Sequence, residues 1–126
     1  MRYERYQRVF LEGVIDICIE QGWQSYSADI ERTHRALTAP GVTTVVAVDE
    51  GTVCGFAQVQ SDGEIQAHLS VLTVKGSYRR RGVGSELIAQ SFRASGGIRL
   101  DLVTEDAQGF YESMYHSLKS GFRIYP

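Results

Sequence analysis

The stretch that decides the fold is Leu72-Thr73-Val74-Lys75-Gly76-Ser77-Tyr78-Arg79-Arg80-Arg81-Gly82-Val83-Gly84-Ser85. It leads from the end of a predicted strand through a basic, glycine-bearing turn into the start of a helix. A helix N-terminus offers backbone N–H groups without internal partners, and the helix dipole adds partial positive charge there. Gly82 and Gly84 lack side chains, so the backbone can approach a ligand closely. The turn from Lys75 to Arg81 carries four positive side chains and no acid, and it therefore predicts a phosphate-binding site.

Two other phosphate-binding motifs do not fit this turn. A P-loop needs Lys-Ser/Thr directly after its second glycine, whereas here the run is Gly82-Val83-Gly84. A dinucleotide fingerprint needs three glycines in fixed register after the first strand, and the chain lacks that run. The plain alternative is a solvated arginine-rich loop, with Tyr78 as a packing residue at the strand end.

The segments on either side of the turn alternate between helical and extended patterns. The predicted helices run over 7–21, from a cap at Ser27 or Asp29 to Pro40, over 83–96, and from a cap at Thr104 through Met114. The predicted strands cover 1–6, 44–48, 53–60, 64–74, 98–103 and 121–126. Turns at 49–52 and 62–63 join the middle strands as hairpins. The order β-α-α-β-β-β-α-β-α-β predicts a mixed α/β layer structure.

Length and composition limit the class of protein. The chain has 126 residues, which fits one domain that buries its own core. Its net charge of −2 argues against a dedicated nucleic-acid or membrane-surface protein. Cys18 and Cys54 lie in apolar stretches and are predicted to be buried free thiols, which fits a reducing compartment. Neither a membrane span nor a secretory leader is recognisable, so we expect a cytoplasmic protein.

The basic turn resembles a loop of the GNAT superfamily of N-acetyltransferases. That family carries Arg/Gln-x-x-Gly-x-Gly/Ala between its fourth strand and third helix, and Arg79-Arg80-Arg81-Gly82-Val83-Gly84 matches it at each position. The order of predicted elements agrees with the family across residues 1–122. The resemblance implies one GNAT domain over residues 1–126, with a mixed, mostly antiparallel sheet flanked by helices on both faces.

The resemblance also implies the chemistry. It implies acetyl-CoA as cosubstrate, no metal, and direct transfer of the acetyl group to a primary amine in a ternary complex. In the family a bulged strand offers amides to pantetheine, and the following loop holds the phosphates. The residues expected to bind the cosubstrate are Leu72, Thr73, Val74, Arg79, Arg80, Arg81, Gly82, Val83, Gly84 and Ser85.

Acyl transfer needs a deprotonated amine and a proton for the leaving thiolate. Phe110-Tyr111 resembles the Phe/Leu-Tyr pair on the family's fourth helix, whose tyrosine often lies near the thioester sulfur. The resemblance therefore assigns the acid role to Tyr111, and Tyr115 is the substitute if the register differs. The alternative is a tyrosine that only packs on the strand behind it.

The base and the acceptor pocket are less well marked. Even spacing along a regular strand places His68 on the same face as Leu72 and Val74, and histidine titrates near neutrality. His68 is thus the candidate base or water relay, Glu64 is a weaker one, and many relatives use only a water chain. Trp23 and Tyr26 lie between the first two helices, where the family's acceptor pocket is usually found.

The C-terminal region departs from the family pattern. Relatives commonly read Phe-Tyr-x-x-x-Gly-Phe, whereas here the connection from Tyr111 to Gly121-Phe122 is longer. The last strand that normally lies beside the fifth is missing, so either the short tail pairs there or a second subunit covers the edge. We therefore expect a homodimer.

Two rival functions use the same features. A non-catalytic acyl-CoA sensor would keep the loop from Arg79 to Gly84 and would not need Tyr111 or His68. A nucleic-acid-binding protein would use the basic cluster with aromatic stacking residues, of which only Tyr78 is adjacent. We rank the nucleic-acid-binding function last. The identity of the amine acceptor stays open.

Overall fold

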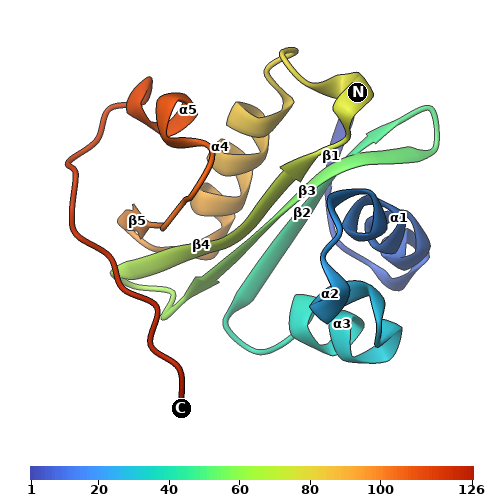
Figure 1. Ribbon diagram of the computed structural model, residues 1–126, viewed down its shortest axis with the longest axis horizontal. Coiled ribbons are helices and arrows are strands. Elements are labelled where there is room, and N and C mark those ends of the chain that lie inside the picture. Colours follow the sequence, from blue (N-terminus) through green and yellow to red (C-terminus); the bar gives the residue numbers. More distant parts are fainter.

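Segments rich in β-branched residues form the sheet at the centre of the molecule. The computed structural model describes residues 1–126 and contains a five-stranded sheet in the order β1-β2-β3-β4-β5 (Figure 1). The strands are β1 (Arg2–Arg5), β2 (Val42–Asp49), β3 (Thr52–Ser61), β4 (Gln66–Val74) and β5 (Arg99–Asp101). Neighbours pair antiparallel except β4 and β5, which are parallel. β2 and β3 are buried over most of their length, as expected for strands covered on both faces.

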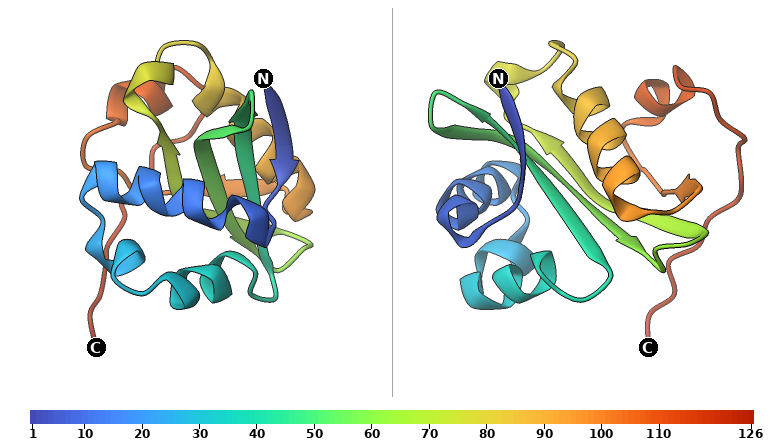
Figure 2. Two further views of the ribbon diagram at one scale, coloured as in Figure 1. Left: turned by 90° about the vertical axis from the view of Figure 1, so that its right-hand side faces the viewer. Right: turned by 180° about the vertical axis from the view of Figure 1, so that it is seen from behind.

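Helices cover both faces of this sheet. A 3-10 turn at Arg8–Phe10 leads into α1 (Leu11–Gln21), followed by α2 (Gln24–Ser27) and α3 (Ile30–Leu37). α4 (Val83–Ser95) and the short α5 (Gln108–Glu112) complete the set. Figure 2 shows α1 to α3 on one face and α4 across the other. The mixed, mostly antiparallel sheet with helices on both faces is therefore confirmed. No helix has the length and apolar character needed to cross a membrane.

The core consists of two apolar clusters, one on each face of the sheet. The stripe of α1 that carries Val14, Ile17 and Cys18 packs with Leu37 and Phe56 on the first face. The buried face of α4 packs against apolar residues of β2, β3 and β4 on the second face. The predicted cores of both helices are thus correct, and both cysteines are buried free thiols.

Local turn chemistry agrees with the sequence. Glu50 and Gly51 both have positive φ, 49° and 82°, which is the type I′ geometry of a two-residue hairpin. Of the two caps proposed for α3, the structure selects Asp29, whose side chain accepts from the Arg32 N–H at 3.1 Å. α4 ends at Gly96, where a Cβ would lie 2.7 Å from the Gly63 carbonyl oxygen.

The predicted C-terminal strand at 121–126 is wrong. Residues after α5 form no regular secondary structure, and 115–126 are all exposed and make no backbone–backbone hydrogen bond. Gly121 passes so close to Val103 that a Cβ would lie 2.6 Å from its Cγ1, yet the two segments form no ladder. An alternating pattern alone cannot make a strand, because a strand also needs a partner edge in register.

Candidate active site

A divergence between β4 and β5 opens the sheet. The two strands pair only between Gln66–His68 and Arg99–Asp101. β4 then continues to Val74 while β5 ends, so the second half of β4 pairs only with β3. The register between β3 and β4 also shifts at Gln58/Val59, which leaves Ser70 as an extra residue between Leu69 and Val71. The outer edge of this half of β4 therefore has backbone groups free to pair with a ligand.

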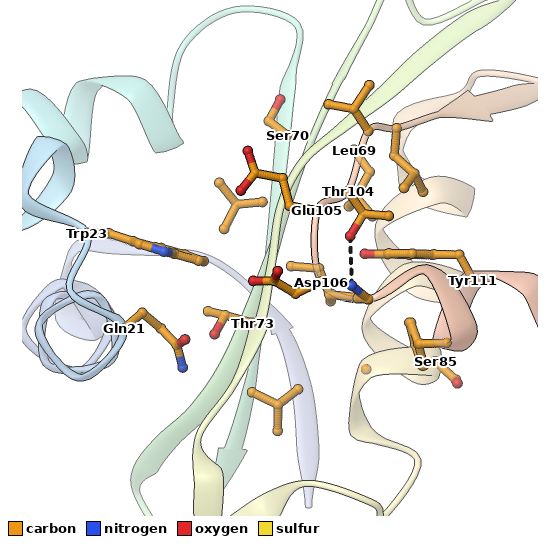
Figure 3. Close-up of a pocket in the computed structure, with 18 of the residues that line it drawn as sticks. Gln21, Trp23, Leu69, Ser70, Thr73, Ser85, Thr104, Glu105, Asp106 and Tyr111 are labelled. Atoms are coloured by element: carbon orange, nitrogen blue, oxygen red, sulfur yellow. Dashed lines mark hydrogen bonds between the residues drawn. The ribbon is translucent and has the colours of Figure 1, made fainter. Parts of the chain in front are cut away.

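A large cleft lies along that free edge. Its volume is about 1170 Å³, and it extends from the end of α1 across β4 to α4 and α5. Figure 3 shows β4 between the side chains from the α1–α2 side and those from α5. The 27 lining residues are Gln21, Trp23, Leu69, Ser70, Val71, Leu72, Thr73, Val74, Tyr78, Arg79, Arg80, Gly82, Gly84, Ser85, Leu102, Val103, Thr104, Glu105, Asp106, Ala107, Phe110, Tyr111, Ser113, Gly121, Phe122, Arg123 and Tyr125.

One end of the cleft is the N-terminus of α4. Gly82 is the N-cap in left-handed conformation (φ 78°), and no side chain caps the helix. The N–H groups of the first turn therefore have no helical partner. A Cβ at Gly82 would meet no atom within 4 Å, whereas one at Gly84 would lie 3.4 Å from the Phe110 ring. Open space in front of free N–H groups, with Arg79 and Arg80 on the same wall, fits an anionic phosphate.

The structure brings most of the predicted cosubstrate residues together. Leu72, Thr73, Val74, Arg79, Arg80, Gly82, Gly84 and Ser85 all line the cleft. Arg81 does not line it, because its guanidinium lies over the ring of Tyr78. The side chain of Val83 is also absent from the lining, because it is buried in the cluster beneath α4.

Tyr111 lies on α5 and lines the cleft at the other side of β4. Burial raises the pKa of its phenol above the usual 10.0. Thr104 Oγ1 accepts from the Ala107 N–H at 3.1 Å, and the Tyr111 ring reaches toward this turn in Figure 3. Phe110 packs edge-on against Tyr111, with ring centroids 5.0 Å apart. The site thus has a protonated phenol at its edge, while Tyr115 is fully exposed and does not line the cleft.

His68 does not reach the cleft. It is exposed and lines a separate depression with Pro40 and Gly41. The expectation that His68 shares a face with Leu72 and Val74 is wrong, because the extra residue Ser70 shifts the alternation of β4 by one position. Glu64 lies in the exposed turn before β4 and does not line the cleft either.

The two predicted acceptor residues are neighbours with different exposure to the cleft. Trp23 lines it, and Tyr26 packs behind Trp23 with ring centroids 6.0 Å apart. Burial raises the pKa of Tyr26, whose backbone oxygen accepts from Thr33 Oγ1 at 2.6 Å. Tyr26 therefore supports Trp23 and does not itself line the cleft.

Sequence reasoning missed several lining residues. Figure 3 shows the carboxylates of Glu105 and Asp106 between Trp23 and Tyr111. Their position directly after the strand that follows the phosphate turn was a usable signal, because that strand borders the cleft. The tail residues Phe122, Arg123 and Tyr125 also line it, and no local pattern indicates this.

Comparison with known proteins agrees with this geometry. Residues 40–114 match the family model of the acetyltransferase (GNAT) domain. The aminoglycoside N-acetyltransferase AAC(6')-Iy, in complex with a CoA bisubstrate analogue, superposes with a TM-score of 0.80 at 20% identity, covering 99% of this chain and 96% of that one. A GNAT-family acetyltransferase from Streptococcus pneumoniae gives 0.79 at 25% identity, covering 99% and 97%.

One more solved structure and the curated proteins add to this comparison. A structure described as a transcriptional regulator from Bacillus halodurans gives a TM-score of 0.80 at 14% identity, with 98% of each chain covered, and so shows the fold alone. A search of curated protein sequences finds no match. The GNAT family model covers more than half of this chain and includes β2 to β5, the basic turn, α4 and α5. The chain belongs to the GNAT superfamily of acyl-CoA-dependent acetyltransferases.

Proposed function

We propose that this protein moves the acetyl group of acetyl-CoA to a primary amine by direct attack in a ternary complex. The observation that carries the proposal is one continuous cleft that joins the α4 N-terminus to Tyr111 along the free edge of β4. A complex of AAC(6')-Iy with CoA, 18% identical and with a TM-score of 0.79, supports the choice of cosubstrate.

The cosubstrate would lie with its phosphates at the α4 N-terminus. The free N–H groups after Gly82, together with Arg79 and Arg80, supply donors and positive charge there. The pantetheine amides would pair with the unpaired outer edge of Leu72–Val74, as an added strand does. This arrangement points the thioester end away from the phosphate turn and along β4.

The chemistry needs one bond to form and one to break. The amine nitrogen attacks the thioester carbonyl carbon, which forms the C–N bond, and the C–S bond then breaks. The thiolate takes the phenolic proton of Tyr111, and the phenolate regains a proton from water, which also receives the proton that the amine loses. Because its pKa is raised, the Tyr111 phenol is protonated at neutral pH, and it donates its proton when the C–S bond breaks and the thiolate forms. The Tyr111 hydroxyl makes no hydrogen bond within the chain, so it is free to face a ligand in the cleft.

We propose that water removes the proton of the attacking amine, because His68 lies outside the cleft. Glu105 and Asp106 place negative charge beside the aromatic wall formed by Trp23. Opposite charge raises the local concentration of a cationic amine before it loses its proton. The proposed acceptor is accordingly a small molecule or peptide that carries at least one ammonium group.

Two measurements test the proposal together. Acetyl-CoA should raise the melting temperature, because a ligand that binds only the native state stabilises it. Release of free thiol from acetyl-CoA should then accelerate with at least one member of an amine panel. No thermal shift at millimolar acetyl-CoA contradicts the cosubstrate assignment. A thermal shift without acceleration by any amine contradicts the enzyme and favours an acyl-CoA sensor.

A further inference from the structure

The phosphate turn is attached to a distant hairpin by one side-chain hydrogen bond. The hydroxyl of Tyr78 donates to Asp49 Oδ2 at 2.9 Å. Asp49 is the last residue of β2 and stands at the mouth of the type I′ hairpin formed with β3. The strands of that hairpin are paired up to Asp49 and Thr52, so the hydrogen bond attaches the turn to the sheet.

The bonds that hold the turn to β3 and α1 lie before Tyr78. The Lys75 N–H donates to the Cys54 carbonyl at 2.7 Å, and the Gly76 N–H donates to Glu20 Oε1 at 3.0 Å. These contacts hold only the start of the turn against β3 and α1. Arg79 Nε donates to the Val74 carbonyl at 3.2 Å, and this bond ties the turn only to the end of the strand directly before it.

The part of the turn that lines the cleft begins at Tyr78 and continues through Arg79, Arg80 and Gly82. Arg80 has a φ of 63°, unusual for a residue with a side chain, and Gly82 has a φ of 78°. Arg81 lies between them with its guanidinium carbon 5.2 Å from the centroid of the Tyr78 ring. Tyr78 therefore holds two things in place: its hydroxyl joins the turn to β2, and its ring supports the arginine that precedes the N-cap of α4.

We propose that Tyr78 and Asp49 are positioning residues that hold the turn in the conformation that binds the phosphates of coenzyme A. The proposal rests on the proposed function, since it concerns the same site. Asp49 does not line the cleft, so its effect on binding must pass through Tyr78. A turn that is already ordered loses less conformational freedom on binding, so the anchor strengthens binding of the phosphate end alone.

The chemistry of the pair suits a permanent anchor. The Asp49 hydrogen bond raises the pKa of Tyr78, so the hydroxyl stays protonated and keeps donating at neutral pH. The bond also gives the Asp49 carboxylate a hydrogen-bond donor, although this carboxylate lies near the proposed phosphate site.

The test is Tyr78→Phe, which keeps the ring beneath Arg81 and removes only the hydroxyl. Calorimetric titration should show the Kd for coenzyme A rising about three- to tenfold, the scale of one net hydrogen bond. The Kd for pantetheine, which lacks the phosphates, should be the same in variant and wild type. The melting temperature without ligand should change little, because the ring still packs on the α4 cluster.

A second variant and a control separate positioning from general stability. Asp49→Ala should weaken coenzyme A binding by a similar factor, and the double variant should be no weaker than the poorer single one, since both remove the same bond. Tyr3→Phe is the matched control, because Tyr3 packs against the same cluster and its hydroxyl makes no hydrogen bond within the chain. It should leave both dissociation constants unchanged.

The outcomes distinguish this inference from the function on which it rests. If wild type fails to bind coenzyme A, the proposed function and the inference both fall. If wild type binds and Tyr78→Phe binds equally well, the inference alone falls. Equal weakening of coenzyme A and pantetheine also overturns it, since that result indicates a general loss of the cleft.

Discussion

At the scale of single residues, the Tyr111 hydroxyl carries the most specific prediction. Tyr111→Phe keeps the packing of the ring against Phe110 and removes the proposed acid. We expect kcat to fall roughly 100-fold, the usual scale for one general acid, with the Kd for acetyl-CoA nearly unchanged. Steady-state kinetics and calorimetry on one preparation check both values, and unaltered turnover would remove Tyr111 from the mechanism.

The pH dependence of the same residue follows from its environment. Burial raises the Tyr111 pKa above 10.0, so the acid form is present at all lower pH values. The activity that depends on this proton should therefore be constant through neutrality and be lost only as pH rises above 10. A kcat profile measured between neutral and alkaline pH, with Tyr111→Phe as control, tests this. A decline near pH 8 that is absent in the variant would contradict it.

Asp62 supports a prediction about stability. Its carboxylate accepts from the N–H groups of Glu64 and Ile65, both at 2.8 Å, and from Gln66 at 3.2 Å. The bonds to Ile65 and Glu64 are the main reason that its pKa lies below 3.8. A lowered folded-state pKa means that the ionised group stabilises the fold above the unfolded pKa and stops doing so as pH falls through the folded value.

Asp62→Ala should therefore lower the melting temperature at neutral pH, and the gap from wild type should narrow as the solution is acidified below pH 4. Thermal denaturation across that range provides the measurement. Glu64→Ala is the control, because Glu64 lies in the same turn and is exposed like Asp62, but its carboxylate accepts no such bonds. A gap that stays constant with pH would show that the carboxylate charge is not responsible.

At the scale of elements, the N-terminus of α4 decides cosubstrate binding. Gly82→Asp places a carboxylate in open space that we assign to phosphate, so repulsion should abolish coenzyme A binding. The φ of 78° adds a strain of about 1 to 2 kcal/mol for any side chain. Calorimetric titration of the folded variant provides the test.

The matched control is Gly63→Asp. Gly63 has a φ of 81° and open space at its Cβ position, yet it lies in the β3–β4 turn outside the cleft. It should show a similar loss of thermal stability with normal coenzyme A binding. If Gly82→Asp binds as well as Gly63→Asp, the phosphate site has been placed wrongly.

At the scale of the whole molecule, the C-terminal tail is the segment that packs least against the rest of the fold. Figure 2 shows it running from α5 around the outside of the sheet. It exposes large apolar side chains at Tyr115, Leu118, Phe122, Ile124 and Tyr125, and the outer edge of β5 has no strand beside it. Exposed apolar segments next to an open sheet edge invite pairing with another chain.

We therefore expect a homodimer in which the tails and β5 edges of two copies cover one another. Sedimentation equilibrium should show the dimer, and Ile124→Asp should shift it toward monomer, because a buried charge is costly. Val9→Asp is the control, because Val9 is also an exposed apolar residue but lies in the 3-10 turn before α1. A monomer at high concentration would contradict this expectation. It would mean that the backbone N–H and C=O groups of the tail form hydrogen bonds with water alone.

Local chemistry made the turn, the hairpins and the two helix faces readable from the sequence. Gly82 favours a left-handed cap because it has no side chain, whatever the rest of the fold. The apolar spacing in 83–92 predicts which face of α4 is buried. The same holds for the hairpin at 49–52, where Gly51 favours the turn, but the positive φ of Glu50 is set by the pairing of the strands. The resemblance then supplied the role of Tyr111, which no periodicity indicates.

The rest depended on contacts between distant segments. One extra residue at Ser70 moved His68 out of the site, and a bulge is a mismatch between two strands that neither strand shows alone. The tail alternates like a strand but has no edge in register, so it stays unpaired. The sequence by itself determined the phosphate turn, the sheet and their order; only the tertiary structure decided which side chains enter the cleft, because register and strand divergence are properties of pairs of segments.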